Sequence, residues 1–375
     1  MIKRLHFILL LSVLSVSFFT SNMLAQEAEH GTVLDGQAHH EQQEELDVQE
    51  LILEHLADAY EWHLFTINEK AVSIPLPVIL FSKTNGFKIF SSSQLEHVSS
   101  LDKPFYIASD GKYKGKIVER NSAGEEVRPL DLSLTKNAAS ILISSFLLIV
   151  AIMSIARSYK NGSLEGKKGF NGAMEFLIES LMNDVIRPSI GKQYKRYAPY
   201  VLTLFFFIFF NNLLGIIPIF PGGANVTGNI SITLVLALFT FITVNFTGSK
   251  SYYKDLFWPD VPTFLKAPFP LMQIIELVGT ITKPFALMIR LFANITAGHS
   301  IMLGLTSVVF VTVSLGAGIN AGMTGVSVLF NIFIFFLEIL VAFIQAYIFT
   351  ILTSVFIGLA RNPEPAKKKQ TKQLD

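Results

Sequence analysis

The fold is decided by a long apolar stretch, residues 271–315, which reads LMQIIELVGTITKPFALMIRLFANITAGHSIMLGLTSVVFVTVSL. As a single helix it would measure about 68 Å, whereas the hydrocarbon core of a bilayer is about 30 Å thick. A second stretch of this kind covers residues 323–360. We therefore expect two long helices that cross a membrane at a steep tilt, are broken, or are partly shielded from lipid by another protein.

The composition of the whole chain also indicates an integral membrane protein. Of the 375 residues, 51% are hydrophobic and 16% are charged, whereas soluble domains carry about 25% charged residues. Residues 197–249 contain no Asp, Glu, Lys, Arg or His. A net charge of +1 argues against a nucleic-acid binder, and the absence of cysteine excludes disulfides and thiolate chemistry.

Three shorter apolar runs predict further spans at residues 137–156, 198–219 and 229–248, and an amphipathic stretch near residues 170–181 predicts a cytoplasmic helix. Basic residues gather in the segments 157–196 and 249–270 and in the C-terminal tail, whereas the connections 220–228 and 316–322 carry no charge. The positive-inside rule places the basic segments in the cytoplasm and the residues before 132 outside. The predicted fold class is an all-α polytopic membrane protein of about five transmembrane helices, the last two long and tilted.

The N-terminal third is predicted to differ from the rest. Residues 1–25 are typical of a secretory signal peptide, and the alternative is an uncleaved first membrane helix. Residues 26–131 predict a small, strand-containing extramembrane domain, because Asn85-Gly86 separates two apolar runs as in a β-hairpin. An amphipathic helix is expected over residues 52–63. The membrane domain would then cover residues 132–375.

We expect no metal site and no other cofactor. The histidines of the extramembrane region match no spacing of metal ligands, so solvated side chains are the simpler interpretation. They are His39, His40, His55 and His63.

Ionisable residues interrupt both long apolar stretches: Glu276, Lys283, Arg290, His299 and Glu338. Each costs at least about 2.5 kcal/mol near a bilayer centre if it is unpaired, so such residues commonly face protein or water and mark ion paths. Interfacial snorkelling is the alternative for Glu276 and Lys283, and a structural ion pair is the alternative for Arg290.

The spacing of these residues predicts how they share helix faces. Glu276, Lys283 and Arg290 are seven residues apart and lie on one side of a helix, and Asn294 follows Arg290 by one turn. His299 lies on the opposite side. On the next helix Glu338 and Gln345 share a face, so a hairpin of the two helices would let His299 approach Glu338 and satisfy both groups.

The chemistry of these groups suggests an interrupted proton path. A His–Glu pair exchanges protons near neutral pH, because histidine titrates near 6.5. Arg290 stays positively charged, since the guanidinium pKa exceeds about 12, and a fixed cation blocks a continuous proton wire. A passing carboxylate that Arg290 would hold ionised should belong to a partner.

Four ordered motifs resemble subunit a of F-type ATP synthases. The most specific is residues 283–299, KPFALMIRLFANITAGH, which is similar to the signature helix of that family. Residues 212–218 (NLLGIIP), 227–234 (TGNISITL) and 345–349 (QAYIF) support it. The resemblance covers roughly residues 132–360.

The resemblance implies a function without an active site of its own. Subunit a is the stationary part beside the rotating c-ring, bound to the peripheral-stalk b subunits in the bacterial inner membrane, and it gives protons access to the ring through two half-channels. By resemblance Arg290 is the essential arginine between them. Outer half-channel positions are Asn294, His299, Glu338 and Gln345; Glu276 and Lys283 lie towards the cytoplasmic exit, and Asn212 lines or braces the path, or packs.

The chain departs from the family pattern at two points. The acid and the imidazole at His299 and Glu338 are exchanged relative to many bacterial members, which keeps one of each. The extramembrane domain exceeds the family's usual short N-terminus; stabilising assembly, contacting a stalk subunit and shielding the channel mouth all remain open for it. An autonomous proton-coupled secondary transporter is the alternative function, but no internal repeat is evident. An intramembrane enzyme would need a richer catalytic cluster, and a plain anchor does not explain Arg290.

Overall fold

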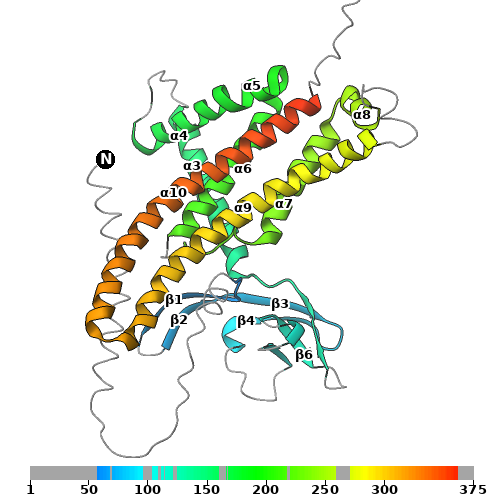
Figure 1. The fold of residues 1–375 in the computed structure, drawn as a ribbon. Coiled ribbons are helices and arrows are strands. Elements are labelled where there is room, and N and C mark those ends of the chain that lie inside the picture. Colours follow the sequence, from blue (N-terminus) through cyan, green and yellow to red (C-terminus); the bar gives the residue numbers. More distant parts are fainter. Residues whose placement is uncertain are drawn as a thin grey trace, which may run out of the picture. The chain divides into compact units, whose positions relative to one another are not determined.

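The structure is a computed structural model (Figure 1). It describes residues 57–361 except for 68–69, 96–103, 109–110, 114, 121–124, 160–165, 167, 218–219 and 259–270. The expected signal peptide therefore lies outside the described residues, as do residues 52–56 of the helix expected over residues 52–63.

Five helices in the described part of the chain lie in segments long and apolar enough to cross a membrane. They are α3 (Lys136–Tyr159), α6 (Tyr194–Ile216), α7 (Ile230–Thr247), α9 (Leu271–Val311) and α10 (Ala317–Arg361). The predicted number of spans is confirmed, and so is the unusual length of the last two, at 41 and 45 residues. A short 3-10 segment, η6 (Thr312–Leu315), follows α9 and leads through Gly316 into α10.

Shorter helices precede the second span and follow the third. The amphipathic helix expected near residues 170–181 is present as α4 (Gly169–Ser180). It continues through a π-helical segment, η3 (Leu181–Ile186), into α5 (Arg187–Ile190) and η4 (Gly191–Gln193). Another helix, α8 (Lys250–Phe257), follows α7; Ser249 caps it by accepting a hydrogen bond from the backbone N–H of Tyr252.

The described extramembrane part forms three antiparallel sheets. β1 (Glu61–Ile67) pairs with β2 (Lys70–Pro75). β3 (Pro77–Ser82) lies between β4 (Gly86–Ser91) and β8 (Leu130–Asp131). The third sheet has the order β5 (Phe105–Ile107), β6 (Ile117–Arg120), β7 (Glu126–Val127), and 3-10 turns follow β4 at η1 (Ser92–Gln94) and β5 at η2 (Gly111–Tyr113).

The predicted hairpin is confirmed, and the predicted helix is wrong where it can be tested. β3 and β4 pair across the turn at Asn85-Gly86, where Gly86 has a φ of 67°, a value that glycine adopts without strain. The expected helix over residues 52–63 does not extend through His63, which lies in β1. Residues 61–67 read EWHLFTI, and their β-branched and aromatic side chains favour a strand.

A small core closes the extramembrane sheets. It contains Tyr60, Val78, Leu80, Leu95, Phe105 and Ile117, all buried. The Tyr60 hydroxyl donates to Asp131 Oδ2 at 2.5 Å, and burial together with this carboxylate raises the pKa of Tyr60 well above its ordinary value. The phenol is therefore a neutral donor in the core.

The chain folds into two compact units. The first combines residues 1–140, 215–225 and 298–337; the second combines 141–214, 226–297 and 338–375.

In the first unit, backbone and ring contacts join β1 and the residues before it to the start of α3 and to the segment after α6. The Lys136 N–H donates to Ala59 O at 2.8 Å, and the Asn137 N–H donates to Asp58 Oδ1 at 3.0 Å. The Trp62 ring meets Phe220 edge-on, with ring centroids 5.1 Å apart.

In the second unit, α6 packs against α9 and α10. Buried Phe205 and Ile208 of α6 contact a cluster that includes Leu287 and Leu291 of α9 and Phe349 of α10.

Candidate functional site

Arg290 lies near the middle of α9 and faces outward. The helix buries Leu287, Leu291 and Ile295 against the core of the second unit, so the opposite face is exposed. Arg290 and Asn294 both lie on that exposed face, as their one-turn spacing predicts. Among the residues that the structure describes, none forms an ion pair with the Arg290 guanidinium. The described residues therefore give no support to the alternative of a structural ion pair.

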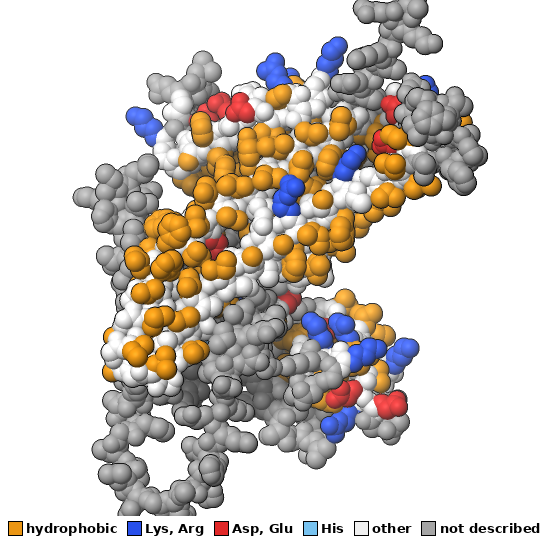
Figure 2. Space-filling model, in the orientation of Figure 1, with side chains coloured by type: hydrophobic (Ala, Val, Ile, Leu, Met, Phe, Trp, Pro, Cys, Tyr) orange, Lys and Arg blue, Asp and Glu red, His pale blue; other side chains and the backbone are white. Residues whose placement is uncertain are grey.

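Small side chains surround Arg290 on its own face. Ala286, Ala293 and Ala297 are exposed at positions four before, three after and seven after the arginine. Alanine projects little beyond the helix backbone, so another helix can approach closely at this level. Figure 2 shows that hydrophobic side chains cover most of α9 and α10, with few charged groups among them. This face suits contact with lipid or with an apolar partner, and it presents the Arg290 guanidinium near the middle of α9.

The two predicted polar positions of α10 are buried. Glu338 is 3% exposed and Gln345 is 6% exposed, and their spacing of seven residues places them on one face, as predicted. Small residues, Ala342 and Ala346, are buried near Gln345. A carboxyl group in this position is costly unless it is bound to other polar groups or to a proton.

His299 is partly buried in the first unit, beside the end of α6. A Cβ atom at Gly215 would lie 3.7 Å from His299 Nε2 and 3.2 Å from Ala224 O. The glycine therefore leaves space in which the imidazole sits. His299 and Glu338 belong to different units, so their predicted approach stays a prediction.

Asn212 connects three segments of the second unit. Its side chain is 2% exposed. Its Oδ1 accepts a hydrogen bond from the Thr227 hydroxyl, and its Nδ2 donates to Ala342 O at 3.3 Å. Of the roles that the sequence leaves open for Asn212, this geometry favours bracing of α6 against α10 and against the segment before α7. Thr227 is a polar partner that the sequence places in a motif but does not connect to Asn212.

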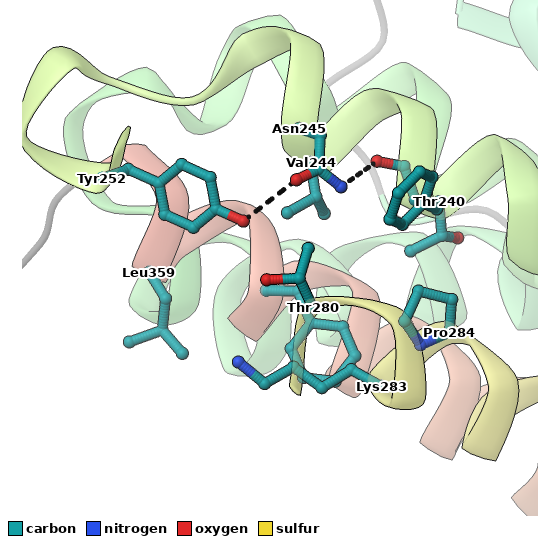
Figure 3. A pocket seen from close by; sticks show the side chains of 10 residues that line it. Thr240, Val244, Asn245, Tyr252, Thr280, Lys283, Pro284 and Leu359 are labelled. Carbon is teal, nitrogen blue, oxygen red and sulfur yellow. Dashed lines mark hydrogen bonds between the residues drawn. The ribbon is translucent and has the colours of Figure 1, made fainter. Parts of the chain in front are cut away.

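A pocket opens beside Lys283 (Figure 3). Its empty volume is about 370 Å³, part of it open to solvent. Side chains of α7, α8, α9 and α10 line it: Thr240, Phe241, Val244, Asn245, Tyr252, Thr280, Lys283, Pro284, Phe356 and Leu359. Lys283 Nζ lies 6.0 Å from the centre of the Phe356 ring, so an aromatic face supports its ammonium group.

Hydrogen bonds hold the polar wall of this pocket in place. The Tyr252 hydroxyl donates to Asn245 Oδ1 at 3.1 Å, and Asn245 Nδ2 donates to Phe241 O at 2.8 Å (Figure 3). Burial raises the pKa of Tyr252, so its phenol stays protonated. Glu276 lies on α9 two turns before Lys283 and is partly exposed. Sequence reasoning selected Glu276 and Lys283 but missed Thr240, Asn245, Tyr252 and Thr280, because only tertiary packing brings these helices together.

Carboxyl and amide groups are buried within apolar helices, and an arginine points outward from the middle of one of them. These features are typical of one class of protein, the polytopic membrane proteins that handle ions inside the bilayer. A family model described as "ATP synthase A chain" matches residues 139–358. The chain belongs to this family, and the resemblance of its four motifs is confirmed. A second model, described as a domain of unknown function (DUF8433), matches residues 51–136, which include the eight strands of the described part of the chain.

Curated relatives carry the same family name. "ATP synthase subunit a 2" of Chlorobaculum tepidum is 42% identical over 245 residues, which are 63% of this chain and 65% of that protein. "ATP synthase subunit a" of Chlorobium phaeobacteroides is 43% identical over 236 residues, 61% and 66% of the two chains. The Anaeromyxobacter protein of that name is 35% identical over 270 residues, 70% and 61%. The aligned part thus spans just under two thirds of each of these relatives.

Proposed function

We propose that this chain is the stationary proton-channel subunit of an F-type ATP synthase. It gives protons access to and from a rotating c-ring through two half-channels that Arg290 separates. The observation that carries the proposal is the outward position of Arg290 at the centre of α9, surrounded by small side chains.

The chemistry of that position fits a ring of moving carboxylates. The guanidinium stays protonated even when it is desolvated, because its pKa exceeds about 12. It stabilises an ionised carboxylate brought against it and repels a free proton, so a proton cannot pass directly from one half-channel to the other. The small side chains of Ala286 and Ala293 let the partner helix come close enough for this contact.

Two groups of polar residues supply the half-channels. Asn294, His299, Glu338 and Gln345 belong to the outer one, and Asn212 holds its walls together through Thr227 and Ala342. The pocket beside Lys283 belongs to the cytoplasmic one, with Thr280, Asn245 and Tyr252 in its wall. Glu276 lies one turn before Thr280 on α9, and its backbone carbonyl accepts a hydrogen bond from the Thr280 hydroxyl. The chain itself catalyses no reaction; the complex makes ATP.

The setting follows from the charge distribution. We place residues 26–131 outside a bacterial inner membrane, after a signal peptide of residues 1–25, and the membrane domain at residues 132–375 with its C-terminus in the cytoplasm. Partners are the c-ring and the peripheral-stalk b subunits. A self-contained transporter fits less well, because such proteins line their substrate path with buried groups, whereas Arg290 points outward.

The test is ATP-driven acidification of inverted membrane vesicles. We expect Arg290→Ala to reduce pumping to the background level while the chain still co-purifies with the c-ring. Thr282→Ala is the matched control, since Thr282 is also exposed on α9, and it should pump normally. Pumping that survives Arg290→Ala in an intact complex would overturn the proposal.

A further inference from the structure

One face of the β4-β3-β8 sheet is apolar across all three strands. The strand register places Phe81 opposite Phe87 on one side and opposite Leu130 on the other. In the next row Ile79 pairs with Ile89, and the Leu132 N–H donates to Ile79 O at 2.9 Å. Because side chains alternate between the faces of a strand, these residues point to the same side. We name them the apolar sheet face: Ile79, Phe81, Phe87, Ile89, Leu130 and Leu132.

This face is not part of the domain core. The core uses the opposite side of β3, where Val78 and Leu80 are 1% and 0% exposed. On the apolar sheet face the exposed fractions are 54% for Phe81, 60% for Phe87, 62% for Ile89, 57% for Leu130 and 63% for Leu132. Contiguous apolar patches of this kind on an extramembrane domain mark contact with another protein or with a membrane.

The connection to α3 favours the membrane. Leu132 lies in the apolar sheet face, and α3 begins at Lys136, four residues later, which is a reach of at most about 14 Å. The Leu134 N–H donates to Pro77 O at 3.1 Å, so the strand pairing continues almost to the helix. The hydrogen bonds from Lys136 N to Ala59 O and from Asn137 N to Asp58 Oδ1 then fix the first turn of the span to the domain. The apolar sheet face is therefore held near the point where the chain enters the bilayer.

Charges at the far end of the face suit a lipid surface. Lys83 follows the last residue of β3, and Arg128 precedes β8 by two residues; both are exposed. Basic side chains beside apolar ones are the pattern of segments that lie in the interface, where the apolar groups enter the boundary of headgroups and acyl chains and the cations meet phosphate.

We propose that the apolar sheet face lies on the bilayer surface next to the start of α3, so that the extramembrane domain is a membrane-resting platform. The phenyl rings of Phe81 and Phe87 and the neighbouring aliphatic side chains enter the headgroup boundary. This proposal does not depend on the proton path.

The absence of cysteine from the chain allows a direct test. Ile89→Cys and Phe87→Cys in the full chain are labelled with the fluorophore NBD and reconstituted in nanodiscs of phosphatidylcholine and phosphatidylglycerol. Both labels should emit at shorter wavelength than in water, and lipids with a nitroxide near the headgroup should reduce the emission at least twofold. Ile107→Cys, an exposed aliphatic position in the other three-stranded sheet, is the matched control and should show neither effect.

Each other outcome contradicts the proposal. Blue-shifted emission that the nitroxide lipids do not quench would mean that protein covers the face, either a second copy of the chain or another segment. Emission as in water would mean that the face is solvated. Quenching of the Ile107→Cys label to the same extent would mean that contact with lipid is not specific to the apolar sheet face.

Discussion

The charge of Arg290 is decisive at the scale of single residues because it cannot be removed by deprotonation. We expect Arg290→Lys to lose nearly all ATP-driven pumping although it keeps a cation. A lysine ammonium surrounded by apolar groups loses its proton readily, and it cannot hold a carboxylate with two parallel hydrogen bonds. Acidification of inverted vesicles measures the effect. Pumping by Arg290→Lys at more than half of the wild-type rate would show that position and charge alone suffice.

His299 and Glu338 form the second prediction at this scale. We expect His299→Ala and Glu338→Ala each to impair pumping, and the double variant to lose less than the sum of the two effects in free energy. Residues that interact directly show coupling of about 0.5–3 kcal/mol in such cycles. The measurement is the pumping rate of the four proteins at equal assembly. Strictly additive losses would mean that the two groups act independently.

The polar residues of the site show what the sequence could and could not predict about it. Faces shared along one helix follow from spacing, so it was predictable that Arg290 shares a face with Asn294 and Glu338 with Gln345. Contacts between helices do not follow from spacing. The hydrogen bonds from Asn212 to Ala342 O and from Thr227 to Asn212 join positions 130 and 15 residues apart, and no local pattern reveals them.

Helices α5 and α10 approach closely at the scale of elements, and a glycine makes this possible. A Cβ atom at Gly358 would overlap the Ser189 carbonyl, whereas at Gly325 on the same helix nothing lies within 4 Å. Gly358→Ala should therefore destabilise the fold by about 1–3 kcal/mol, the usual cost of overpacking. Gly325→Ala should be neutral or stabilising by up to about 1 kcal/mol, because alanine favours a helix. Thermal denaturation of the purified chain compares them.

The long membrane helices were the most predictable elements, and the short helices and strands were the least predictable. Long uncharged runs leave few alternatives, so α3 and α7 begin and end within a few residues of the expected limits. β1 was missed because a helical spacing up to His63 competed with the strand preference of residues 61–67. α8 has eight residues, too few for a periodic signal to stand out.

At the scale of the whole molecule, the chain forms two compact units. We therefore expect a destabilising substitution in the extramembrane sheets to act mainly on those sheets. Trp62 is 3% exposed and packs edge-on against Phe220 within the first unit. Trp62→Ala should cost about 3–5 kcal/mol, as truncation of a buried aromatic side chain usually does. The aromatic cluster around Phe205, which belongs to the second unit, makes none of these contacts. We expect the extramembrane sheets to become sensitive to protease while the chain still assembles with its complex.

Limited proteolysis of membranes, followed by purification of the complex, measures both effects in one sample. Val72→Ala is the control, because Val72 is 38% exposed on β2 and its truncation removes little packing. If Trp62→Ala abolished assembly as well, the sheets and the membrane helices would have to fold as one cooperative structure. If protease cleavage of Trp62→Ala increases only in the sheets, the extramembrane domain is stable independently of the membrane domain, which belongs to the ATP synthase A chain family. Its own loss of stability would then leave the proton path intact.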